Sequence, residues 1–198
     1  MHLQSHKRII ILASSSPYRK ILLEQLKIPF ETHSPEVDET AAPGEDPVAL
    51  VERLAREKAQ ALSSRYPQAI VIGSDQLATC GGQIAGKPGN KQNAVAQLQS
   101  FSGQTVLFHT AISVVCARPH YSFERTVSTK VIFRNLDDEE IHRYVEADNP
   151  TDCAGSFKSE SLGISLLRGM SSDDPTAIVG LPLIAVSDGL REAGIDLP

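Results

Sequence analysis

A short apolar segment that runs directly into a polar turn is the feature that most constrains this chain. Residues 9–12 are Ile-Ile-Ile-Leu, and their β-branched content predicts a buried strand. Three serines and a proline at 14–17 interrupt the segment, with Ser16 as a candidate N-cap and Pro17 as a candidate first helical residue. Apolar residues then recur at helical spacing as far as Leu26. The sequence therefore predicts a strand, a tight turn and a helix.

The start of this predicted helix is a candidate anion site. Its free backbone N–H groups and the hydroxyl of Ser14 are donors, and a helix N-terminus favours negative charge. Arg19 lies in the first turn, where an arginine opposes the helix dipole. A bound anion, most commonly phosphate, would explain this placement. The alternative is a surface arginine on an ordinary strand-turn-helix unit.

The composition limits the size of the fold and its partners. With 198 residues and 41% hydrophobic content, the chain is expected to form one compact α/β unit or two small lobes that share a sheet. A net charge of −5 and a pI of about 5.7 are atypical of proteins that bind extended DNA or RNA. A small anionic ligand remains compatible, because a few lysines in a cleft are sufficient to bind it.

The sequence also bears on where the protein acts. No run of 18 apolar residues is present, so we expect no membrane-spanning helix and no membrane partner. Residues 1–7 are polar, lack the apolar core of a signal peptide and predict a loose tail. Three cysteines lie far apart without metal-site spacing, which favours reduced thiols. We therefore expect a cytoplasmic protein with a single domain over residues 8–198, since no linker is long enough to separate two domains.

The remaining pattern predicts further strands and helices. The helix after Asp46, with Pro47 in its first position, carries apolar residues at a 3.6 period, and Lys58 borders that stripe. An apolar strand that begins at residue 69 delivers Asp75 at its end. The other predicted elements are a strand at 29–34, hairpins at 77–85 and at 105–117 with 122–133, helices at 91–101 and 136–145, a strand at 164–167 and a final helix that begins near residue 182.

Polar residues collect in four loops. The loops span 14–19, 36–39, 73–76 with 86–88, and 154–160, and three of the four follow an apolar, strand-like segment. In α/β sheets, ligand sites gather beyond the ends of the strands. We therefore expect the four loops to surround one site.

The charges in and near these loops suit a polyphosphate and a metal ion. Glu39 and Asp75 could hold a hard divalent cation through oxygen, or one of them could activate water. Each residue also has a structural explanation, such as a solvated turn lysine or a carboxylate that marks a turn. The cations that could neutralise a triphosphate are Arg19, Lys58, Lys87 and Lys158.

Six ordered motifs resemble those of the Maf family of nucleotide pyrophosphatases. They are Ala-Ser-Ser-Ser-Pro-Tyr-Arg at 13–19, Pro-Glu-Val-Asp-Glu at 35–39, Gly-Ser-Asp-Gln at 73–76, Gly-Lys-Pro at 86–88, Ala-Gly-Ser-Phe-Lys-Ser-Glu at 154–160 and Gly-Leu-Pro at 180–182. The resemblance runs from about residue 8 to the C-terminus and leaves out only residues 1–7.

The resemblance implies a fold and a reaction. The fold would be α/β, with a twisted mixed sheet flanked by helices and two lobes around a nucleotide-binding cleft, as in Maf and ITPase-like proteins. Members hydrolyse nucleoside triphosphates to a monophosphate and pyrophosphate with a divalent cation such as Mg²⁺, Mn²⁺ or Co²⁺. The family's catalytic acids fall on Asp75 and Glu39, which would also hold the metal. Its phosphate-binding positions fall on Ser14, Arg19, Lys58 and Lys87.

Three further positions resemble the YceF-type branch of the family, which acts on 7-methyl-GTP. Tyr18, Gln76 and Glu160 match its aromatic, Gln and Glu, although a Trp is also familiar at the first position. The branch directed at thymidine and uridine nucleotides more often has Arg, Thr and Gln there. An aromatic face attracts the cationic 7-methylguanine ring, a carboxylate accepts from its N–H groups, and an amide offers both a donor and an acceptor.

Two alternatives to 7-methyl-GTP hydrolysis stay open from the sequence. The chain could act on dTTP and UTP within the same family, or it could be a nucleotide-binding regulator of septum formation with weak turnover. The presence of both Glu39 and Asp75 favours an enzyme, because binding a polyanion does not require two acids beside it. A small nucleotide is the expected partner, and a homodimer is left open.

Overall fold

The computed structural model describes residues 8–198, so the tail predicted at 1–7 lies outside the described residues. The elements in chain order are β1 (Ile10–Ala13), α1 (Pro17–Glu24), β2 (Glu31–His33), α2 (Pro47–Arg65), β3 (Ile70–Cys80), β4 (Gln83–Ala85), α3 (Lys91–Phe101), β5 (Thr105–Cys116), β6 (Tyr121–Phe133), α4 (Asp138–Asp148), β7 (Leu167–Ser171) and α5 (Leu183–Glu192). Short 3₁₀ helices lie at Ala154–Ser156, Leu162–Leu166 and Ala177–Val179.

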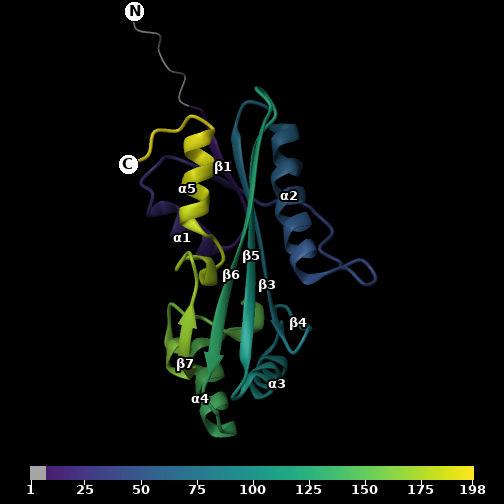
Figure 1. Cartoon of the computed structure of the whole chain (residues 1–198), viewed down its shortest axis with the longest axis vertical. Helices are drawn as coiled ribbons and strands as arrows, with labels where there is room; N and C mark the ends of the chain where they lie inside the picture. The colour runs from purple at the N-terminus through teal and green to yellow at the C-terminus, as the bar shows by residue number, and fades with distance from the viewer. Residues whose placement is uncertain (1–7) are drawn as a thin grey trace, which may run out of the picture.

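A seven-stranded sheet with the order β2-β1-β3-β5-β6-β7 organises the fold, and β4 pairs with β3 off this path (Figure 1). β1 is parallel to β2 and to β3, whereas the other pairings are antiparallel. Helices cover both faces of this twisted sheet. The predicted α/β fold class with a mixed sheet is confirmed.

Two lobes share the long central strand β3. On one face, Ile70 and Ile72 belong to an apolar core that α1 and α5 cover. Further along the same face, Ala78 belongs to a separate core that α3 and α4 cover. Polar Ser74 and Gln76 lie between the two cores. This face is therefore apolar at both ends and polar where the lobes meet.

Two of the predicted units are confirmed. β1 and α1 form the strand, turn and helix, with Ser16 as the N-cap and Pro17 as the first helical residue. β5 and β6 form the long antiparallel hairpin, paired from Thr105 opposite Ile132 to Cys116 opposite Tyr121.

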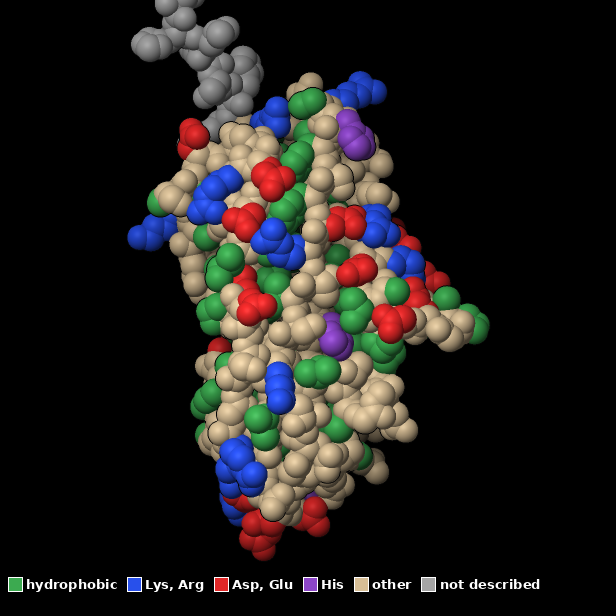
Figure 2. All heavy atoms as spheres, in the orientation of Figure 1, with side chains coloured by type: hydrophobic (Ala, Val, Ile, Leu, Met, Phe, Trp, Pro, Cys, Tyr) green, Lys and Arg blue, Asp and Glu red, His purple; other side chains and the backbone are tan. Residues whose placement is uncertain are grey.

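On the face that Figure 2 shows, acidic and basic side chains lie interspersed rather than in one basic area. Within residues 8–198, no helix combines the length and apolar character needed to cross a bilayer.

The strand predicted at 164–167 is wrong. Leu162–Leu166 forms a 3₁₀ helix, and the strand begins one residue later as β7. In a strand, Ile164 and Leu166 would point to the same side. Ile164 is instead 53% exposed while Leu166 is buried. The helical turn separates the two side chains, so only Leu166 joins the core.

β3 also differs from its prediction, in a way that shapes the site. The sequence predicts Asp75 at a strand end, and this is wrong because β3 continues to Cys80 while paired with β5. β1 stops at Ala13, opposite Gly73, and β4 pairs with β3 only from Ala78 onward. Asp75 therefore lies in mid-strand, along the stretch of β3 edge between β1 and β4.

Candidate active site

The turn between β1 and α1 positions Arg19. Ser16 caps the helix by accepting from the Arg19 backbone N–H at 3.4 Å, and Ser14 Oγ accepts from the Ser16 N–H at 3.1 Å. The Arg19 guanidinium donates from Nε to the Gly180 carbonyl at 2.8 Å and from Nη1 to Ser14 Oγ at 3.4 Å. Burial lowers the pKa of Arg19, and two nearby carboxylates oppose this change. The arginine is thus a fixed cation beside the turn.

A close contact between β3 and α2 brings Lys58 to Asp75. A Cβ atom at Gly73 would lie 2.2 Å from the Ala55 carbonyl oxygen and 2.7 Å from the Ala59 nitrogen. Only a residue without a side chain allows the two backbones to approach this closely. Lys58 lies on this face of α2 and is 6% exposed, and its Nζ contacts Asp75 Oδ1 at 2.6 Å.

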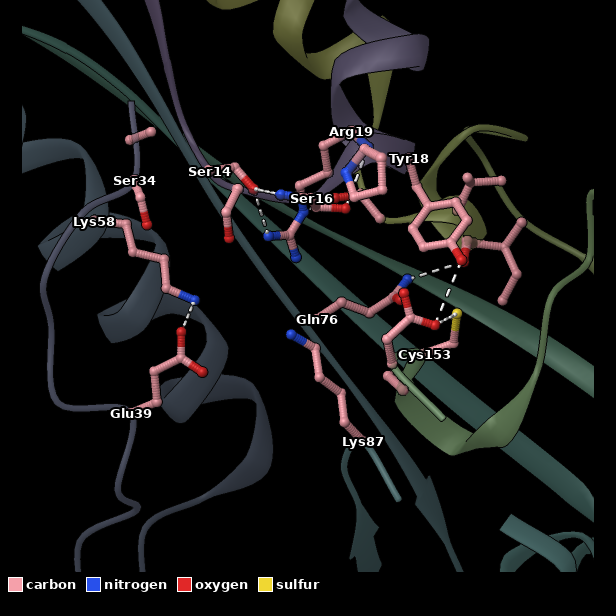
Figure 3. Close-up of a pocket in the computed structure, with 18 of the residues that line it drawn as sticks. Ser14, Ser16, Tyr18, Arg19, Ser34, Glu39, Lys58, Gln76, Lys87 and Cys153 are labelled. Carbon is pink, nitrogen blue, oxygen red and sulfur yellow. Dashed lines mark hydrogen bonds and ion pairs between the residues drawn. The ribbon is translucent and has the colours of Figure 1, made fainter. Parts of the chain in front are cut away.

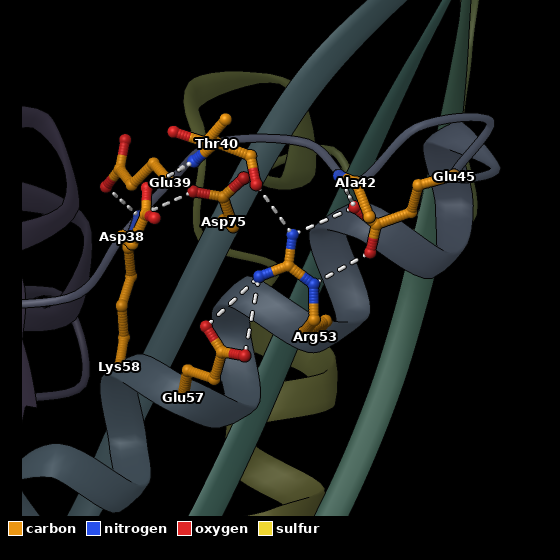
Figure 4. Close-up of polar contacts among 9 residues, drawn as sticks. All are labelled: Asp38, Glu39, Thr40, Ala42, Glu45, Arg53, Glu57, Lys58 and Asp75. Atoms are coloured by element: carbon orange, nitrogen blue, oxygen red, sulfur yellow. Dashed lines mark hydrogen bonds and ion pairs between the residues drawn. The ribbon is translucent and has the colours of Figure 1, made fainter.

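Lys58 contacts a second carboxylate in the same way. Its Nζ also lies 2.6 Å from Glu39 Oε1, so one ammonium bridges Glu39 and Asp75 (Figure 4). The Asp75 side chain is 12% exposed, whereas the Glu39 side chain is 56% exposed. Partial burial would raise the pKa of Glu39, but the hydrogen bond from Lys58 and the charges of Lys58, Lys87 and Arg19 together hold it below its ordinary value. Glu39 is thus held as a carboxylate.

The loop that carries Glu39 is anchored by Arg53 of α2 (Figure 4). Arg53 donates from Nε and Nη2 to the Glu45 carboxylate at 2.7 and 2.9 Å, and from Nη2 to the Thr40 carbonyl at 3.1 Å. Its Nη1 lies 3.2 Å from Glu57. The hydrogen bond from Arg53 lowers the pKa of Glu45 to about 2, so the carboxylate stays charged well into the acid range.

The predicted residues meet around one cavity of about 300 Å³, at the lower end of the range typical of small-molecule sites. Lys58 and Glu39 lie on one side of it and Tyr18 and Cys153 on the other, with Lys87 between them (Figure 3). Asp75 is joined to this lining through Lys58. The predicted residues that line the cavity are Ser14, Tyr18, Arg19, Glu39, Lys58, Gln76, Lys87 and Glu160.

Lys158 is placed differently from the other predicted cations. Its Nζ donates to the carbonyls of Asp148 and Asn149, at 2.8 and 3.4 Å, which lie at the C-terminal end of α4. The same atom lies 5.5 Å from the centre of the Tyr18 ring. Lys158 is not part of the cavity lining, and its contacts are typical of a lysine at the C-terminal end of a helix. Phosphate binding by Lys158 stays a prediction.

Sequence reasoning missed two residues beside Tyr18. The Tyr18 hydroxyl lies 3.4 Å from Asp152 Oδ1, and both Asp152 and Cys153 line the cavity. Burial is the main cause that raises the pKa of Cys153, to about 12, so this thiol stays protonated. Their only signal in the sequence is their position just before the motif at 154–160.

The amide of Gln76 is oriented by its neighbours. Its Nε2 donates to Thr110 Oγ1 and the Ala177 carbonyl, each at 2.9 Å, and to the Ile178 carbonyl at 3.1 Å. Three acceptors around the nitrogen fix the rotation of the amide. Gln76 therefore uses its donors inside the protein and offers the cavity its oxygen, an acceptor, rather than the donor and acceptor expected from the sequence.

The donor set of Glu39 and Asp75 fits a hard divalent cation. Each carboxylate has an oxygen 2.6 Å from the same Lys58 atom, so the two oxygens lie near a common point. Among residues 8–198, no cluster of three or more His, Cys, Asp or Glu could hold a metal. Enzymes that act on phosphorylated substrates usually bind Mg²⁺ through one or two protein carboxylates. Phosphate oxygens and water supply the other ligands.

The cavity beside the mixed sheet brings fixed cations close to a pair of carboxylates. This arrangement suits a phosphorylated small molecule. The family described as Maf-like protein matches residues 9–193, and the chain belongs to this family. The predicted resemblance is therefore confirmed.

Relatives cover nearly the whole chain. Proteins named 7-methyl-GTP pyrophosphatase are 55% identical in Aromatoleum aromaticum, over 96% of this chain and 97% of that protein, and 51% identical in Polaromonas sp., over 96% and 87%. The protein of that name from Pseudomonas aeruginosa is 49% identical over 96% and 98%. Among solved structures, the Staphylococcus aureus Ham1 protein aligns with a TM-score of 0.49 and 14% identity over 65% of this chain and 73% of that chain.

Proposed function

We propose that this protein hydrolyses 7-methyl-GTP to 7-methyl-GMP and pyrophosphate. The observation that carries the proposal is a single cavity with charged residues at one end and Tyr18 at the other (Figure 3). Lys58 and Glu39 line the first end, and Lys58 joins Asp75 to it. Tyr18, Gln76 and Glu160 also belong to the lining, and we assign them to the base. The relatives named 7-methyl-GTP pyrophosphatase, at 49–55% identity, support the same activity.

The charged end suits attack of water on the α-phosphorus. Asp75 accepts a proton from the water, or orients it, as the new oxygen–phosphorus bond forms and the bond from the α-phosphorus to the bridging oxygen breaks. Pyrophosphate leaves with the bridging oxygen, and Arg19 and Lys87 neutralise the charge of the phosphate groups before and during this step. A divalent cation held by Glu39 and Asp75 would supply further charge neutralisation.

The other end suits a cationic purine. Tyr18 offers an aromatic face, which attracts a cationic ring by about 0.5–2 kcal/mol. The Gln76 oxygen and the Glu160 carboxylate are both acceptors, and guanine presents adjacent N–H donors on one edge. Thymine and uracil have one ring N–H between two carbonyls, so they would leave one of these acceptors without a donor.

The test is pyrophosphate release from 7-methyl-GTP, GTP, dTTP and UTP. We expect 7-methyl-GTP to give the highest kcat/KM. A preference for dTTP or UTP would place the chain in the other branch of the family. Nucleotide binding without release of pyrophosphate from any of the four would instead favour a nucleotide-binding regulator with weak turnover.

We predict that a chelator abolishes turnover. A divalent cation between the triphosphate and the carboxylates of Glu39 and Asp75 would offset the repulsion between these like charges. Excess EDTA should stop pyrophosphate release, and Mg²⁺, Mn²⁺ or Co²⁺ added in excess of the chelator should restore it. Full activity in excess EDTA would contradict the metal requirement.

Lys87→Ala should chiefly raise KM. A lysine that binds phosphate as a point charge acts on the ground state and the transition state alike, so its loss weakens binding without slowing the chemical step. The comparison of kcat and KM for 7-methyl-GTP in wild type and variant measures this. A defect confined to kcat would show that Lys87 acts on the transition state.

Arg53→Met should release the loop that carries Glu39. Loss of residues that orient a metal ligand typically costs about 10–100-fold in metal affinity. We expect the Mg²⁺ concentration for half-maximal activity to rise by about tenfold, with kcat at saturating Mg²⁺ less affected. Arg56→Met is the matched control, because Arg56 also lies on α2 but pairs with Glu124 instead. Equal Mg²⁺ dependence in both variants would contradict the positioning role.

A further inference from the structure

Lys58 bridges Glu39 and Asp75, which the proposed function assigns as metal ligands. The inference from this position deepens the proposed function and rests on that assignment. The Lys58 ammonium lies 2.6 Å from one oxygen of Glu39 and 2.6 Å from one oxygen of Asp75. Divalent metals bind carboxylate oxygens at about 2.0–2.6 Å, so an ion shared by the same two oxygens would occupy the same space. Lys58 therefore stands where such an ion would bind.

We propose that Lys58 is an internal counter-ion that keeps the metal position closed until the ammonium withdraws from the carboxylates. The buried Asp75 requires a cation beside it, because an unpaired carboxylate in this environment is strongly unfavourable. Lys58 meets this need in the protein without metal. Since Lys58 lines the same cavity as Arg19 and Lys87, the withdrawn ammonium is positioned to contact phosphate oxygens.

Among the described residues, Lys58 differs from the other cations near the two acids. Lys87 and Arg19 affect the charge of Glu39, but neither forms an ion pair with Glu39 or Asp75 at 4.0 Å or less. Only the Lys58 ammonium must move away from both oxygens. Its removal should therefore strengthen metal binding, whereas a lysine that serves only phosphate or only the fold would leave metal affinity unchanged or reduced.

The experiment measures Mn²⁺ binding by calorimetry without nucleotide. We expect Lys58→Met to bind Mn²⁺ at least about tenfold more tightly than wild type, because an adjacent like charge shifts ionic equilibria by one or more powers of ten. Lys58→Arg keeps the charge and should not tighten binding. Lys87→Met is the matched control from the same cavity, and we expect a change below about threefold, since its charge is more distant.

A second neutral variant guards against loss of the fold. Lys58→Gln leaves an amide that can donate to Asp75, and its affinity for Mn²⁺ should also rise. Unchanged or weaker Mn²⁺ binding in the folded neutral variants would overturn the inference. Because the measurement uses no nucleotide, its failure is distinct from a failure of the wild type to hydrolyse 7-methyl-GTP.

Discussion

Asp75→Asn is expected to lower kcat for 7-methyl-GTP by about 10²–10⁴-fold, the range typical of general acid–base catalysis, with little change in nucleotide affinity. Asparagine keeps the shape of the side chain, and its oxygen can still accept the hydrogen bond that Lys58 donates to Asp75 Oδ1 at 2.6 Å. It cannot accept a proton from water or offer a full charge to a metal. Single-turnover and steady-state rates measure the effect on the chemical step, and a separate binding measurement gives the effect on nucleotide affinity.

Asp46→Asn is the matched control for this variant. Asp46 caps α2, the helix that carries Lys58, by accepting from the N–H groups of Val48 and Ala49. Asparagine caps a helix about as well as aspartate, so this variant should keep both stability and kcat. Turnover close to wild type in Asp75→Asn would exclude Asp75 as the base.

Local chemistry explains the parts of the fold that the sequence predicts correctly. The turn of β1 and α1 depends on a serine cap and a first-turn proline, both of which act within a few residues. The hairpin of β5 and β6 likewise follows from two long β-rich segments joined by a short turn. Contacts between distant segments are the source of the errors. Asp75 remains in mid-strand because β5 pairs with β3 beyond the point at which β1 ends.

In the candidate site too, local motifs are predictable from the sequence, whereas contacts between distant segments are not. The motifs predict that Glu39, Lys58 and Asp75 belong to one site, and the structure brings them together. The bridge itself depends on the close approach of α2 to Gly73, which no pattern in the sequence indicates. The contact by which Arg53 anchors the Glu39 loop also depends on the three-dimensional fold, because it joins α2 to a loop that precedes this helix.

Glu160→Gln should remove most of the preference for the methylated base. The cationic ring of 7-methylguanine makes its N–H groups stronger donors to a carboxylate than those of guanine, and Glu160 is an exposed residue of the cavity lining. Because Gln76 already uses its amide donors on Thr110 and the backbone, it cannot change its role to compensate. We expect a loss of roughly 1.5–3 kcal/mol in the preference for 7-methyl-GTP over GTP, the scale of a hydrogen bond to a charged group.

The measurement is kcat/KM for 7-methyl-GTP, GTP, dTTP and UTP in wild type and in the variant. Glu146→Gln serves as the control, because Glu146 is an exposed glutamate of α4 that pairs with Lys91 and is not part of the cavity lining. Its ranking of the four nucleotides should match wild type. An unchanged ranking in Glu160→Gln would contradict the role of this carboxylate in base recognition. The assignment of Asp75 and Glu39 to hydrolysis would stand, because Glu39 lies across the cavity from Tyr18 (Figure 3) and Asp75 contacts the same Lys58 ammonium as Glu39.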